Sequence, residues 1–117
     1  MSRDSNWYER LEIHEAKIVD YLMSPTNEEG RHKRRFLMAH GFDDERPGML
    51  VDALLAHAAT AVEVSDATTV HGRKWVLRGR LRCPDGRQPV VQVVWMQNVG
   101  RTTVRLITAY PIHGEQR

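Results

Sequence analysis

Three arginines alternate along residues 73–83 and are the side chains best suited to binding a phosphate chain. Successive side chains of an extended strand point to opposite faces, so Arg78, Arg80 and Arg82 share one face of such a strand. The C-terminal half around them is strongly basic: residues 72–117 contain nine lysines and arginines and only two acidic residues. This asymmetry predicts a surface that faces RNA or another polyanion. The alternative is that the arginines only solubilise a sheet face and protect its edges.

The types of the other polar residues favour phosphodiester chemistry without a metal. The six histidines lack close metal-ligand spacing, and the HExxH, paired CxxC, Gly-rich phosphate-loop and GxSxG motifs are absent from the sequence. Acidic residues are scarce in the basic half, whereas a two-metal nuclease needs clustered oxygen ligands. Lysine or arginine could instead stabilise charge on a phosphodiester while histidine, tyrosine or threonine transfers a proton during attack by a 2′-hydroxyl. This reaction requires RNA and no cofactor.

Helices are predicted for the first half of the chain. Residues 13–23 place apolar residues at helical spacing before a Ser-Pro pair ends the helix. A second helix is expected to begin at Thr26, which has capping-box spacing to Glu29, and to end near Gly41, which can adopt the αL conformation. Pro47 suits the first turn of a third helix, whose apolar character predicts the deepest packing.

From residue 61 the hydrophobic period changes to two, which predicts strands. A three-residue turn at 84–86 would place Trp75 opposite Trp95 and Arg78 opposite Gln92. The two tryptophans are therefore expected to be a cross-strand core pair rather than a base-stacking platform.

The second predicted turn, residues 98–101, sets the position of the last strand. A four-residue loop there would place Trp95 opposite Val104 and Gln92 opposite Ile107, with Thr108 on the apolar side. The apolar face for the helices to cover would consist of Trp75, Leu77, Leu81, Val91, Val93, Trp95, Val104 and Leu106. The other face would be polar and basic.

The predicted fold class is therefore α+β, with N-terminal helices packed on one face of a C-terminal four-stranded antiparallel sheet. One domain is expected over 1–117, with a helical part at 1–60, the sheet at 61–111 and a tail at 112–117. Residues 1–12 are expected to form a short helix or a tail. A single cysteine and the lack of a long apolar run predict a cytoplasmic protein without a membrane segment.

The order of sequence motifs resembles an uncharacterised bacterial domain family that occurs alone and at the C-termini of polymorphic toxins. These motifs, which lie between residues 17 and 111, are KIVDYLMSP, EGRHKRRFLMAHGF, HGRKWVLRGRLRCPDGR, VVWMQNV and RLITAYP, and the similarity covers residues from about 13 to 111. The final ITAYP also resembles the last strand of RNase toxins in the barnase–EndoU–colicin–RelE superfamily, which have N-terminal helices followed by a four-stranded antiparallel sheet.

The resemblance implies roles for particular residues. Thr108 and Tyr110 would supply hydroxyl groups at the site, and Lys74 a positive charge at the substrate phosphate. His32 and Lys33 would supply a general base and a basic residue from the helical region. The simpler alternatives are a core threonine at position 108 and a solvated helix surface for His32 and Lys33.

The resulting hypothesis is a metal-independent endoribonuclease-like toxin or toxin-derived domain. Tyr110, Thr108, His32 and Lys74 would be catalytic, and the nucleic-acid-binding residues would be Arg78, Arg80, Arg82, Arg105 and Lys33. The alternatives are a non-catalytic binding protein, such as an immunity or antitoxin partner or a phage-encoded inhibitor of a host defence complex, and an RNA-binding accessory domain. The expected partners are RNA or another polyanion, and a cognate inhibitor or partner protein.

Overall fold

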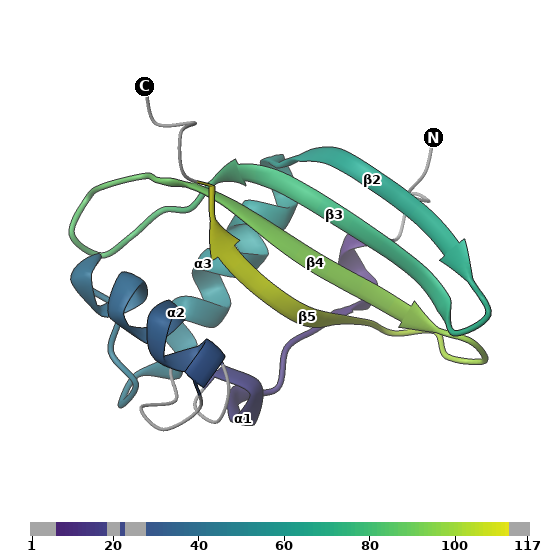
Figure 1. Ribbon diagram of the computed structural model, residues 1–117, viewed down its shortest axis with the longest axis horizontal. Coiled ribbons are helices and arrows are strands. Elements are labelled where there is room, and N and C mark those ends of the chain that lie inside the picture. Colours follow the sequence, from purple (N-terminus) through teal and green to yellow (C-terminus); the bar gives the residue numbers. More distant parts are fainter. Residues whose placement is uncertain (1–6, 19–21, 23–27, 113–117) are drawn as a thin grey trace.

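One five-stranded sheet with helices beside it makes up the computed structural model, which describes residues 7–18, 22 and 28–112 (Figure 1). The helices are a 3₁₀ turn at Tyr8–Arg10, α1 at Glu15–Lys17, α2 at Glu28–Ala39 and α3 at Pro47–Thr60. The strands are β1 at Leu11–Glu12, β2 at Val62–Thr69, β3 at Gly72–Arg80, β4 at Val90–Asn98 and β5 at Val104–Pro111. Among the described residues, no helix is long and apolar enough to cross a membrane.

The sheet is mixed, which corrects the prediction of four antiparallel strands at the C-terminus. Its order is β1-β5-β4-β3-β2, and β1 pairs in parallel with β5, with Leu11 opposite Val104. The other neighbouring pairs are antiparallel, as expected. A strand of two residues is too short to show a period of two, so the N-terminal strand left no pattern in the sequence.

The C-terminal end of α2 and the start of α3 are those that their local sequences predict. Gly41 follows α2 with φ 99°, while the backbone N–H groups of Gly41 and Phe42 donate to Met38 and Leu37. This is a Schellman ending, in which Phe42 and Leu37 are both buried. Pro47 is the first residue of α3. Thr26, the proposed cap of α2, and much of the predicted helix 13–23 lie outside the described residues.

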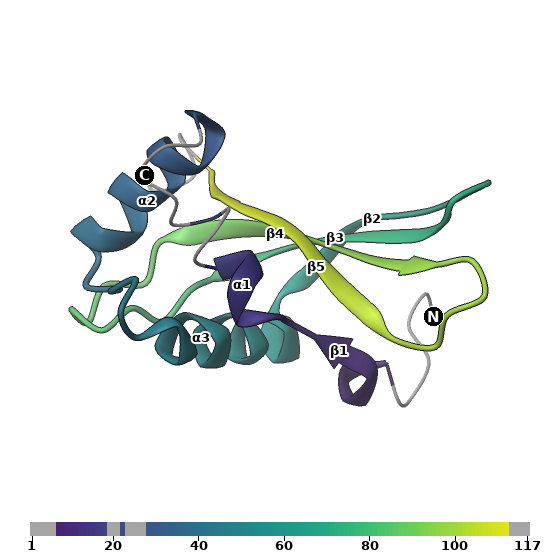
Figure 2. The same ribbon diagram turned by 90° about the horizontal axis from the view of Figure 1, so that it is seen from below.

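The predicted apolar face of the sheet is buried against α3 (Figure 2). Trp75 and Trp95 are paired and almost fully buried, which confirms the expected core pair. Trp7 packs edge-on against both, with ring centroids 5.5 and 6.1 Å away. Trp7 is therefore a core residue. The sequence, which predicted a short helix or tail there, gave no indication of this role, because contacts with distant parts of the chain bury Trp7.

The C-terminal end of α3 contacts the sheet through one polar side chain. His57 is 2% exposed, and its Nε2 lies 2.8 Å from the carbonyl oxygen of Val91. Burial lowers the pKa of His57, against the raising effect of hydrogen bonds with the Val91 and Gly79 backbone. A neutral imidazole thus ties α3 to β4.

The register of β3 and β4 is the predicted one. Trp75 lies opposite Trp95, and Arg78 lies opposite Gln92. β3 ends at Arg80 rather than continuing to Cys83, but hydrogen bonds from Leu81 to Pro89 and from Cys83 to Arg87 preserve the register around the three-residue turn. Gly86 in this turn has φ 91°.

The register of β5 differs from the prediction in two ways. Trp95 lies opposite Leu106 instead of Val104, because β4 extends through Asn98, the first residue of the predicted turn, and β5 begins at Val104. A bulge then adds Ile107 to β5, so that Thr108 lies opposite Val94. The bulge transfers Thr108 and Tyr110 from the apolar side to the other face, which we call the open face.

Candidate functional site

Tyr110 on β5 is the end of a chain of hydrogen bonds across the open face. The Nε2 amide of Gln92 donates to the Tyr110 hydroxyl oxygen at 2.6 Å, and the Arg78 Nε donates to Gln92 Oε1 at 3.0 Å. Because a guanidinium can only donate, Arg78 fixes the orientation of the Gln92 amide, and the amide nitrogen must face Tyr110. The Tyr110 oxygen is therefore an acceptor in this bond, and its own proton can be donated to a further group.

Helix α2 brings several basic side chains to the same place. His32, Lys33, Arg35 and His40 line a hollow of about 550 Å³ together with Tyr110. We call this space the α2–β5 hollow. Its other lining residues are Phe36, Ala39 and Pro111. His32 and Tyr110 are 78 positions apart in the sequence, and they share one concave surface.

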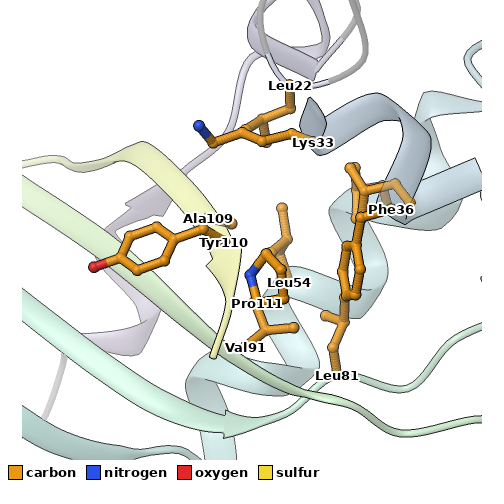
Figure 3. Close-up of a pocket in the computed structure, with 11 residues that line it drawn as sticks. Leu22, Lys33, Phe36, Leu54, Leu81, Val91, Ala109, Tyr110 and Pro111 are labelled. Carbon is orange, nitrogen blue, oxygen red and sulfur yellow. The ribbon is translucent and has the colours of Figure 1, made fainter. Parts of the chain in front are cut away.

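The inner side of the hollow is apolar. Lys33, Phe36, Tyr110 and Pro111 also border a narrow gap that reaches the core (Figure 3). Lys33 and Tyr110 lie on opposite sides of this gap, one on α2 and one on β5, and their polar atoms point away from it (Figure 3). The apolar parts of both side chains therefore close the core, while their polar ends remain at the surface.

The β3–β4 loop holds the C-terminal end of α2 in position. Arg87 donates to the Ala39 carbonyl, and the Asp85 backbone N–H donates to the His40 carbonyl at 3.3 Å. Arg87 also pairs with the Asp85 carboxylate at 2.7 Å. These contacts satisfy carbonyl groups at the helix end and fix the side of the hollow that carries His40.

Thr108 lies on the same face as Tyr110 but does not line the hollow. Its Oγ1 is shielded from solvent and has no hydrogen-bond partner among the described residues.

Lys74 and Arg105 lie on the open face but away from Tyr110. Lys74 is four residues along β3 from Arg78, a separation of about 13 Å at the usual rise of a strand. Arg105 is exposed and donates to Asn98 Oδ1 at 2.7 Å, near the opposite end of β5. The structure therefore does not bring Lys74 and Arg105 together with Tyr110.

Arg80 and Arg82 lie apart from both the α2–β5 hollow and the pair Lys74 and Arg105. Both line a separate hollow of about 200 Å³ beside Ala56, His57 and Thr60 at the end of α3. Arg82 therefore lies just beyond β3, beside Arg80 and apart from Arg78, which bonds Gln92.

Residues with metal-binding groups are not clustered in the described part of the chain: no three His, Cys, Asp or Glu side chains there lie close enough to hold an ion. The chemistry that the α2–β5 hollow can perform with its own groups is proton transfer by histidine and tyrosine beside lysine and arginine cations.

Sequence reasoning missed Gln92, Arg35, His40 and Phe36 as members of this site. The predicted register placed Gln92 opposite Arg78 correctly, so the sequence indicated the contact between these two residues. The contact with Tyr110 depends on the bulge at Ile107, which has no distinctive residue pattern. Arg35, Phe36 and His40 were not assigned to the site, because no local pattern tells which side of a basic helix faces β5.

Comparison with known proteins gives a family and a fold. A family model described as "Domain of unknown function (DUF6883)" matches residues 3–113. No curated protein matches the chain. Among solved structures, a chain from "Contact-dependent growth inhibition toxin - immunity protein complex from Klebsiella pneumoniae 342" is similar, with a TM-score of 0.67 and 16% sequence identity over 86% of this chain and 98% of that chain.

Proposed function

The chain belongs to the DUF6883 family of domains of unknown function, and we propose that it is an RNA-cleaving toxin or toxin-derived domain that needs no metal. The observation that carries the proposal is the shared α2–β5 hollow, which His32, Lys33 and Tyr110 line together. Sequence resemblance to RNase toxins implied roles for five residues, and three of them, His32, Lys33 and Tyr110, line this hollow, whereas Lys74 and Thr108 do not.

The proposed reaction is attack of a ribose 2′-oxygen on the neighbouring phosphorus. His32 accepts the 2′-hydroxyl proton as the new O–P bond forms, and the bond from phosphorus to the 5′-oxygen breaks. Tyr110 gives its proton to the departing 5′-oxygen, since its own oxygen is already an acceptor for Gln92. Lys33 and Arg35 stabilise the negative charge that builds on the phosphate. The products are a 2′,3′-cyclic phosphate and a 5′-hydroxyl.

A non-catalytic role is the second candidate. The solved structure with a similar fold contains both a toxin and an immunity protein, so this fold class occurs where a toxin binds its inhibitor. No carboxylate is found among the described residues that line the hollow, so a histidine there would act without an acidic partner. An immunity protein, a phage-encoded inhibitor or an RNA-binding accessory domain would bind through this surface without cutting.

The test is RNA cleavage in a chelating buffer by purified wild type and two conservative variants. We expect wild type to cut, and Tyr110→Phe to lower kcat about 100-fold or more, because a general acid contributes about 10²–10⁴-fold. His32→Gln should lower kcat in the same range. The matched controls are Tyr8→Phe and His71→Gln, which alter exposed residues outside the hollow.

Three results bear on the proposal. Full cleavage by Tyr110→Phe and His32→Gln would remove the assigned roles. RNA binding without cleavage, weakened steeply by salt, would favour the accessory domain. The absence of both, with a protein captured instead, would favour an immunity-type function.

A further inference from the structure

The α2–β5 hollow combines an apolar floor with a cationic rim. Phe36, Ala39 and Pro111 contribute apolar surface, whereas His32, Lys33 and Arg35 are basic. Its volume of about 550 Å³ lies within the range of small-ligand sites, about 300–1,000 Å³. None of the described residues that line it is acidic. A ligand with a flat apolar part and a negative group would complement both features.

The aromatic ring in this floor is held in place. Phe36 is half-buried and packs partly against the core. Its ring lies 4.5 Å from the His40 ring, centroid to centroid, and His40 Nδ1 is 2.8 Å from the Phe36 carbonyl oxygen. Proteins use aromatic rings held at a solvent-exposed surface to stack the bases of single-stranded nucleic acids.

We propose that the hollow binds one unstacked nucleotide of single-stranded RNA, with its base against Phe36 and Pro111 and its phosphate at Lys33 and Arg35. The inference rests on the proposed function for the identity of the nucleic acid and for the position of the reacting phosphate near Tyr110. A base inside a duplex is stacked and paired, so it cannot reach this floor without the cost of unstacking. The domain therefore selects single strands or loops.

The experiment compares binding and cleavage separately. Binding is measured by anisotropy and by 2-aminopurine fluorescence with an uncuttable 2′-O-methyl RNA oligomer, either single-stranded or annealed to its complement. We expect the single strand to bind at least tenfold more tightly than the duplex, with a change in 2-aminopurine emission. Phe36→Leu keeps apolar packing but removes the aromatic face, and should weaken binding about fivefold.

Matched variants separate this site from general effects. Arg35→Gln should weaken binding, whereas Arg31→Gln on the same helix changes an exposed cation that does not line the hollow and should have a smaller effect. Tyr8→Leu removes an exposed aromatic ring elsewhere and should have no effect.

The outcomes distinguish the two proposals. If the duplex binds as tightly as the single strand, or Phe36→Leu binds as wild type does, the base-binding inference is wrong even when RNA is cleaved. If Phe36→Leu weakens single-strand binding and an unmodified RNA is not cleaved, base binding stands and the nuclease function is wrong.

Discussion

At the scale of residues, the direction of hydrogen bonding decides what Tyr110 can do. Arg78 offers only donors, Gln92 accepts from Arg78 and donates onward, and Tyr110 accepts. The phenol proton is thus not used in the bond to Gln92 and is available to a ligand. In the proposed mechanism Arg78 would be a positioning residue that acts through Gln92, which differs from the phosphate-binding role expected from the sequence.

Replacing Gln92 by glutamate should reverse this direction while keeping the shape of the side chain. A carboxylate accepts from both neighbours, so the Tyr110 hydroxyl would donate to it and lose its free proton. We expect Gln92→Glu to lower kcat about tenfold or more with KM changed by less than about threefold, measured by steady-state cleavage of an RNA oligomer.

Gln97→Glu is the control, because Gln97 lies on the same strand and donates to the Arg101 carbonyl, away from Tyr110. A Gln92→Glu variant with the kcat of wild type and an unchanged melting temperature would show that the bond direction does not matter for activity.

At the scale of elements, α3 can lie close to the sheet because β3 has a glycine at the contact. A Cβ at Gly79 would come within 3.0 Å of both Cα and Cβ of Ala61, just after the helix end. The sequence predicted α3, its Pro47 start and the pairing of β3 with β4 from local patterns. β1 and the bulge at Ile107 were not predictable, since both arise from packing between distant segments.

Gly79→Ala should destabilise the fold because the backbone of Ala61 would have to move. We expect the free energy of unfolding to fall by about 1–3 kcal/mol, measured by urea denaturation. Gly48→Ala is the matched control: its new Cβ meets no atom within 4 Å, and alanine favours a helix, so stability should rise by about 0.5 kcal/mol. Equal stability of Gly79→Ala and wild type would show that α3 shifts freely over the sheet.

At the scale of the whole molecule, the fold divides the basic residues of the C-terminal half instead of collecting them. Lys74 and Arg105 lie far along the open face, Arg80 and Arg82 lie at the end of α3, and Arg73 pairs with Asp66. The alternating pattern correctly assigned residues to faces within β3. The pattern could not reveal where β3 would end. It also could not reveal which basic side chains would form ion pairs with acidic residues elsewhere in the chain. The site instead forms where α2 meets the end of β5.

The central claim is that this site cuts RNA by using the 2′-hydroxyl and no metal. The most direct measurement is end-group analysis by mass spectrometry of one RNA oligomer incubated with the protein in chelator, beside the same oligomer carrying a single 2′-deoxy sugar at the cleaved position. We predict a 2′,3′-cyclic phosphate and a 5′-hydroxyl from the first oligomer and no cut at the substituted position of the second. Cleavage of the 2′-deoxy position, or a requirement for added divalent metal, would contradict the account.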